Sequence, residues 1–169
     1  MTKYIALDTE TTGSDLFHGC KPFAVSTCDE DGNIKYWEWQ VDPNSRCPLV
    51  AKEDLDEICD YIDGSILVFH NSKFDIHALA NIGIRLTFKS VSPQTDSKWA
   101  TAPYEEHFAE AVLEGFEDSL LASHVCNSEE AHGLKPLCAK YFDIMDDDEE
   151  ELLDEVRSAR RRAKALEWN

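Results

Sequence analysis

Several features that mark other protein classes are missing from this sequence. No apolar run approaches the roughly 18 residues of a transmembrane helix, which argues against a membrane partner. The first residues, Met1 to Tyr4, lead directly into an apolar stretch without the pattern of a signal peptide. The 6 cysteines are scattered and form no C-x-x-C pair. We therefore expect reduced thiols in a cytoplasmic protein of a bacterial or phage-infected cell.

A zinc site is also difficult to assemble from this sequence. The candidate ligands that lie near one another are His124, Cys126, His132 and Cys138. Their spacing fits no familiar zinc site. A zinc site at these four residues is the alternative to reduced, metal-free thiols.

Positive charge is scarce. There are 16 Lys and Arg against 34 Asp and Glu, and the formal net charge is −18. Proteins that hold nucleic acid along its length normally present a basic surface, so this chain is not expected to do so alone. A metal site that engages a strand end remains compatible with this charge, because bound cations would neutralise phosphate and a partner could supply a basic surface.

The 169 residues, of which 43% are hydrophobic, suffice for one domain with a proper core, so we expect a single domain over 1–169. Apolar and alternating runs predict strands over 3–8, 23–28, 34–41 and 65–70, and helical spacing predicts helices over 51–62 and 71–83. The segment 89–117 reads as an insertion, with a loop over 90–97 and a helix over 105–113. Further helices are expected from Asp118, over 134–142, and near the C-terminus. We expect Leu120, Leu121, His124 and Val125, and then Leu137, Cys138 and Tyr141, to face inward.

Two carboxylates follow the first apolar strand. Asp8 and Glu10 are spaced i, i+2, so both side chains would point to the same face of the strand. Such a pair repels unless a cation lies between the carboxylates, and Mg²⁺ or Mn²⁺ prefers these hard oxygen ligands. An acidic strand end at a solvent edge is the simpler alternative for an isolated D-x-E.

A third carboxylate follows the strand over 65–70. Asp75 lies in the first turns of the next helix, where it would face back toward the strand end. Asn71 is a reasonable N-cap for this helix and Phe74 an anchor in the core. Alone, this pattern is typical of any capped helix. Together with Asp8 and Glu10 it predicts a shared metal site.

These stretches resemble a known family. Asp8–Glu10 resembles the first motif of the DEDD 3′–5′ exonucleases, the ribonuclease-H-like nucleases that include polymerase proofreading domains, and His70–Asp75 resembles the second motif. Asp118–Ser123 and His132–Phe142 resemble the later part of the proofreading domain of family A DNA polymerases. The resemblance covers 3–83 and 118–142.

The resemblance implies an α/β, ribonuclease-H-like fold with a mixed five-stranded sheet flanked by helices. It also implies hydrolysis of single-stranded DNA from the 3′ end with two cations, Mg²⁺ or Mn²⁺, about 4 Å apart. Asp8 would bridge both cations, Glu10 would hold one, and Asp75 would orient the second. The implied substrate contacts are the backbones of Leu7 and Thr9, together with Asn71 and Phe74. A polymerase domain or another replication protein is the implied partner.

The family needs a fourth carboxylate, in a Y-x-x-x-D or H-x-x-x-x-D motif, and neither pattern follows His132. We therefore expect one of three situations: an N-terminal fragment of a longer polymerase or nuclease, a split product, or an incomplete module that binds a nucleic-acid end without cutting it. Asp146–Asp148 are candidate substitutes for the missing carboxylate. The basic residues over 157–164 could contact phosphate, although a solvated helix explains them more simply. An unrelated acidic α/β interaction protein is the remaining alternative.

Overall fold

The computed structural model describes residues 2–89, 109–144, 154, 157–158 and 161–162. The chain falls into two units, Met1–Cys126 and Asn127–Asn169, and each is described by itself. The expectation of a single domain therefore stays a prediction.

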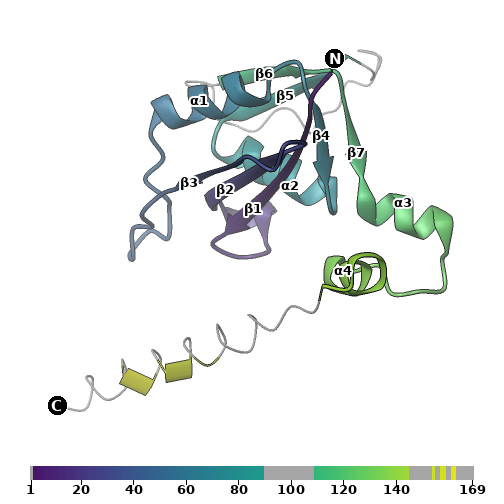
Figure 1. Ribbon diagram of the computed structural model, residues 1–169. Helices are drawn as coiled ribbons and strands as arrows, with labels where there is room; N and C mark the ends of the chain where they lie inside the picture. Colours follow the sequence, from purple (N-terminus) through teal and green to yellow (C-terminus); the bar gives the residue numbers. More distant parts are fainter. Residues whose placement is uncertain (1, 90–108, 145–153, 155–156, 159–160, 163–169) are drawn as a thin grey trace. The chain divides into compact units, whose positions relative to one another are not determined.

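A five-stranded sheet forms the centre of the first unit, with its strands in the order β3, β2, β1, β4, β7 (Figure 1). The strand bounds are Tyr4–Thr11 for β1, Pro22–Asp29 for β2, Ile34–Glu38 for β3, Ile66–Phe69 for β4 and Gly115–Asp118 for β7. β1 pairs antiparallel with β2, and β2 antiparallel with β3. β1 pairs parallel with β4, and β4 parallel with β7. The sheet is mixed, as predicted.

Helices and a small second sheet complete the first unit (Figure 1). Their bounds are Leu16–His18 for the 3₁₀ helix η1, Lys52–Ile62 for α1, Ser72–Asn81 for α2, Ile84–Phe88 for β5, Ala109–Leu113 for β6 and Ser119–Cys126 for α3. β5 and β6 pair in parallel. The second unit contains α4, Leu134–Phe142. No helix within the described residues is long and apolar enough to cross a membrane.

One hydrophobic core lies on one face of the sheet. On β1, the buried side chains of Ile5, Leu7 and Thr9 alternate with exposed ones. The spacing that predicted α1 is confirmed, because Leu55, Ile58, Cys59 and Ile62 are all buried in this core. Because side chains alternate along a strand, Asp8 and Glu10 lie on the opposite, exposed face of β1.

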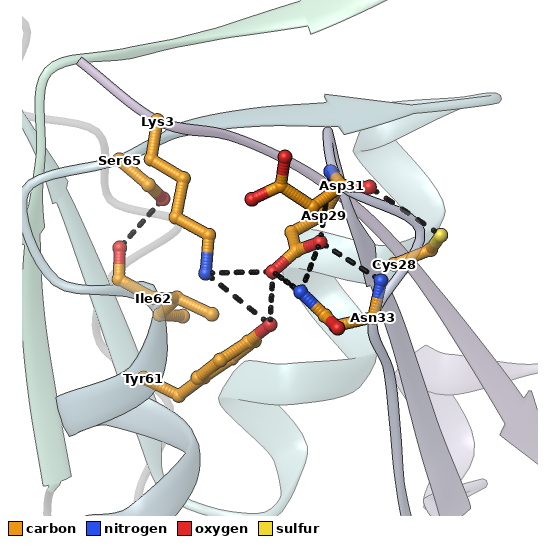
Figure 2. Close-up of polar contacts among 8 residues, drawn as sticks. All are labelled: Lys3, Cys28, Asp29, Asp31, Asn33, Tyr61, Ile62 and Ser65. Carbon is orange, nitrogen blue, oxygen red and sulfur yellow. Dashed lines mark hydrogen bonds and ion pairs between the residues drawn. The ribbon is translucent and has the colours of Figure 1, made fainter. Parts of the chain in front are cut away.

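A polar cluster fixes the far end of β1 and β2 against α1 (Figure 2). Lys3 Nζ lies 3.1 Å from Asp29 Oδ2, and the Tyr61 hydroxyl donates to the same oxygen at 3.3 Å. Asn33 donates to both oxygens of Asp29, which closes the β2–β3 turn. Lys3 also lies over the ring of Tyr61, 4.3 Å from its centroid. These contacts join β1, β2 and α1 at the end of β1 opposite the acidic pair.

The region expected to be an insertion contributes strands to both sheets. The predicted helix over 105–113 is wrong for the described residues 109–113, which form β6. Ala109, Ala111 and Leu113 are buried and alternate with exposed residues, a period of two that only a strand satisfies. β7 then forms the edge of the main sheet. The predicted loop over 90–97 and the residues up to 108 lie outside the described residues.

The predicted inward faces of α3 and α4 are wrong. No side chain of either helix is buried, and among the residues expected to face inward Val125 is 88% exposed and Tyr141 is 62% exposed. An amphipathic stripe is buried only where another element covers it, and within the first unit α3 meets mainly the short strand β4. Of the expected C-terminal helix, the described residues 154, 157, 158, 161 and 162 are helical.

Candidate active site

The candidate site begins at the carboxyl end of β1. Asp8 and Glu10 share the exposed face of the strand, and they pair across the sheet with Ser26 and Ala24. Leu7 faces the other way, with a side chain only 3% exposed in the core. A contact between Leu7 and a substrate would thus have to come from its backbone, as the sequence analysis expected.

Asp75 reaches β1 from the first turn of α2. Its side chain is 3% exposed, and its Oδ1 accepts hydrogen bonds from the hydroxyl of Thr9 at 2.8 Å and from the backbone N–H of Thr9 at 3.1 Å. Since Thr9 lies between Asp8 and Glu10 in the sequence, these two bonds fix Asp75 at the same end of β1, on its buried face. They also occupy the backbone N–H of Thr9, whose backbone was predicted to contact the substrate.

The charge of Asp8 acts on Asp75, and both carboxyl groups have raised pKa values. The pKa of Asp75 is raised to about 6, chiefly because burial disfavours its charged form; the Thr9 hydrogen bonds oppose this rise and the charge of Asp8 adds to it. Burial also raises the pKa of Asp8, against the backbone hydrogen bond of Thr9 and the charge of His70. A cation between the two carboxylates would relieve this repulsion.

The turn between β4 and α2 differs from the expectation. Asn71 occupies the N-cap position, but with left-handed φ 80° and ψ 57° and without a capping hydrogen bond from its side chain. Asn71 is therefore the N-cap residue, as predicted, but its side chain does not make the capping bond. Asp118 provides the cap instead: its Oδ2 accepts from the backbone N–H of Ser72 at 2.7 Å and from the Ser72 hydroxyl at 2.6 Å.

His70 and Ser119 connect this turn to α3. The Ser119 hydroxyl donates to the carbonyl of Phe69 at 3.0 Å, so its oxygen can accept the 2.9 Å hydrogen bond from His70 Nδ1. This arrangement places the proton of a neutral His70 on Nδ1. His70 and Asp118 were not among the predicted site residues. The signal for both was their place in the stretches that resemble the family, His70–Asp75 and Asp118–Ser123.

Phe74 was predicted to anchor the core, but it is half-buried and lines a pocket of about 160 Å³. Helical geometry explains the error, because Asp75 and Ala78 take the buried face of α2 and Phe74 is turned from it. The pocket is lined by Ser14, Leu16, Phe17, Asn71, Lys73, Phe74 and His77. It therefore brings together two of the predicted substrate residues, Asn71 and Phe74.

The β1–β2 loop forms the other wall of this pocket. Asn81 at the end of α2 donates to the carbonyls of Leu16 and Cys20, at 2.9 and 3.0 Å. The ring of Phe17 lies 5.5 Å from that of His77, measured between centroids. These contacts hold the loop against α2.

The acidic residues suit a divalent metal in their chemistry. Asp8 and Asp75 offer hard oxygen donors with raised pKa values, and Glu10 shares the strand end. No arrangement of three or more His, Cys, Asp or Glu side chains that could hold a metal is found within the described residues, and this applies equally to the residues considered for zinc. The candidate fourth acids, Asp146–Asp148, lie outside the described part of the chain.

A sequence model of a family described as 3′–5′ exonuclease matches residues 1–167. The chain belongs to the 3′–5′ exonuclease family. The family is divalent-metal-dependent and acts on nucleic-acid ends. The resemblance noted from Asp8–Glu10 and His70–Asp75 is thereby confirmed.

The chain is also similar to individual proteins of this kind. DNA polymerase DpoZ of Salmonella phage PMBT28 is 35% identical over 86 residues, which are 51% of this chain and 12% of that polymerase. Brucella melitensis NrnC with bound Mg²⁺ superposes with a TM-score of 0.52 at 17% identity, covering 87% of this chain and 57% of that one. The POL domain of Pol1 from M. smegmatis, in complex with DNA primer-template and dNTP, superposes with a TM-score of 0.51 at 15% identity. The match covers 85% of this chain and 20% of that one.

The structural likenesses confirm the ribonuclease-H-like α/β fold with its mixed five-stranded sheet. The chain spans only 12% of the phage polymerase and 57% of NrnC. What those whole proteins do is therefore carried over only as a proposal.

Proposed function

We propose that this exonuclease removes nucleotides from the 3′ end of single-stranded DNA with two divalent cations, Mg²⁺ or Mn²⁺, held by Asp8, Glu10 and Asp75. The observation that carries the proposal is the double hydrogen bond from Thr9 to Asp75. It joins a carboxylate from α2 to the end of β1 that carries the acidic pair. Such an arrangement is costly without a cation and suits the clamp of a two-metal phosphodiesterase.

Each residue of the proposed site has its own role. The charge of Asp8 acts on Asp75, so these two carboxylates, with Glu10 at the same strand end, are the residues that would hold the cations. When bound, these cations would lower the pKa of a water molecule and stabilise negative charge on the phosphate. Thr9 keeps Asp75 oriented through both of its donors.

The pocket beside the acidic residues is the proposed subsite for the terminal nucleotide. Phe74 and Phe17 supply aromatic surface on which a base can stack, and base stacking on such side chains tolerates any sequence. Lys73 supplies positive charge and forms no ion pair with any residue that the structure describes. Asn71, whose backbone is left-handed, also lines this pocket.

A polymerase context is part of the proposal, since the phage relative is a DNA polymerase and the family resemblance is to proofreading domains. The chain would then work beside a polymerase domain that supplies basic surface for the DNA. The alternative is a module of the same fold that binds a nucleic-acid end without cutting it. The observation that favours this alternative is the lack of a fourth acidic motif after His132.

The test is digestion of single-stranded DNA labelled at its 5′ end, in Mg²⁺ and in Mn²⁺. A ladder that shortens stepwise, and that disappears in Asp8→Asn and Asp75→Asn, supports the proposal. Asp60→Asn removes the same charge from an exposed position on α1 and should leave the ladder unchanged. Intact DNA at high enzyme concentration, together with retained binding, would favour the binding module. The same assay with labelled RNA decides between the two substrates.

A further inference from the structure

The carboxylate of Asp118 joins the starts of two helices. Asp118 is the last residue of β7 and pairs across the sheet with Phe69, the last residue of β4. Besides its two bonds from Ser72, it accepts backbone hydrogen bonds from Asn71 at 3.3 Å, from Leu120 at 3.0 Å and from Leu121 at 3.2 Å. A single side chain thus satisfies N–H groups at the starts of both α2 and α3 that the helices themselves leave unpaired.

The start of α2 depends on this carboxylate. Asn71 makes no capping bond, and its left-handed backbone is unusual for a residue other than glycine. The bonds from Asn71 and Ser72 to Asp118 hold this turn in place. Asp75 follows in the first turn of α2, so the direction in which its carboxylate approaches Thr9 is set by the same anchor.

A second connection runs from the neighbouring residue. Ser119 accepts from His70 Nδ1 and donates to the Phe69 carbonyl. His70 lies close enough to Asp8 for its charge to act on that carboxylate. The Asp118–Ser119 pair therefore holds the segments beside both Asp75 and Asp8 without belonging to the acidic group itself.

We propose that Asp118 is a positioning residue of the acidic site, which fixes the approach of Asp75 to Thr9 from outside the group that would hold the metals. This inference rests on the proposed function for its consequence in metal binding. Removal of a direct hydrogen-bond partner of a metal ligand typically changes metal affinity by about 10- to 100-fold. Asp118 acts through the turn before α2, so its removal should have an effect at the lower end of this range.

The variants are Asp118→Ala and a matched control, Asp63→Ala. Asp63 Oδ1 also joins segments far apart in the sequence, accepting from the Val112 backbone at 2.8 Å, but it lies before β4, at the opposite end of that strand from Asp118. Both variants should lower the melting temperature of the full chain. Only Asp118→Ala should alter the acidic site.

Two measurements separate positioning from stability. The first is the hydrogen-exchange rate of the Thr9 amide, which Asp75 protects, relative to the amides of Ile5 and Leu7 in the same strand. The second is the Mn²⁺ concentration that gives half of the metal-induced rise in melting temperature. Asp118→Ala should speed Thr9 exchange selectively and raise the Mn²⁺ midpoint on the order of tenfold, whereas Asp63→Ala should change neither.

If Asp118→Ala lowers the melting temperature but leaves the relative Thr9 exchange and the Mn²⁺ midpoint like those of the control, the positioning role is overturned. If the unaltered chain shows no response to Mn²⁺, the proposed metal site fails instead. The exchange of Thr9 then decides the positioning role by itself, because it requires neither metal nor activity.

Discussion

Replacing Asp75 with Asn should make the protein more stable at neutral pH while removing its metal site. Asp75 is 3% exposed, and its pKa of about 6 stands against an ordinary value of 3.8. Since one pKa unit corresponds to about 1.4 kcal/mol, keeping this carboxylate ionised in the folded protein costs about 3 kcal/mol. An Asn side chain carries no charge, and its Oδ1 can still accept both hydrogen bonds from Thr9.

The sign of the pH dependence follows from where protons are bound. Between pH 3.8 and about 6 the folded protein holds a proton on Asp75 that the unfolded chain has released. The stabilisation that the protonated Asp75 contributes is therefore fully present below pH 3.8, and it is lost as the pH rises through about 6. Asp75→Asn abolishes this contribution, so the difference in unfolding free energy should grow from near zero at about pH 4 to about 3 kcal/mol above pH 7.

Urea unfolding followed by tryptophan fluorescence measures this difference, since Trp37 and Trp39 are buried. Asp60→Asn controls for the loss of one negative charge from the chain. Saturating Mn²⁺ should stabilise the unaltered protein and not the variant. It should therefore reduce the difference in unfolding free energy between the two proteins at neutral pH. A variant less stable than the unaltered protein at neutral pH, or a difference independent of pH, would refute the reasoning.

Three further outcomes can be measured directly. Phe74→Ala should raise the KM for single-stranded DNA with little loss of stability, because Phe74 lines the pocket and not the core; an unchanged KM would exclude it as a nucleotide contact. Mn²⁺ should raise the melting temperature of the unaltered chain but not of Asp8→Ala; equal shifts would place the metal elsewhere. Asn71→Gly should stabilise by about 1 kcal/mol, because Gly adopts φ 80° without strain, and a lower melting temperature would contradict this.

The local patterns of the sequence were sufficient to predict the strand that carries the acidic pair and the buried face of α1. Alternation placed Asp8 and Glu10 on one face because strand geometry leaves no other option. Helical spacing correctly assigned the buried stripe of α1. Both features depend on neighbours within one element, which is why a single sequence contains enough information to predict them.

Features that depend on remote partners were not predictable in this way. The cap of α2 comes from Asp118, which is 47 residues from Asn71, so the sequence around α2 could not reveal it. The strand β6 was missed for another reason: the period-two burial of Ala109, Ala111 and Leu113 is carried largely by alanines, which also favour helices. The surface position of Phe74 likewise depends on which face of α2 meets the sheet.

The dependence of DNA binding on salt tests how an acidic chain holds a polyanion. Each phosphate neutralised by a basic side chain contributes about −0.7 to the slope of log affinity against log salt for a single strand. In the described part of the proposed site, Lys73 is the basic side chain that lines the pocket. Binding of a phosphorothioate strand that resists cleavage should therefore show a shallow slope of about −0.7, which Lys73→Met removes.

A steep slope would contradict this view of the site. It would require several phosphate contacts that the pocket cannot supply, and the basic residues over 157–164 would then be the candidates to test by substitution. A shallow slope combined with a strong requirement for Mn²⁺ would mean that most of the attraction for the strand end comes from cations on Asp8, Glu10 and Asp75. The net charge of −18 would then be no obstacle to function, because these cations reverse the sign of the charge only where the terminal phosphate binds.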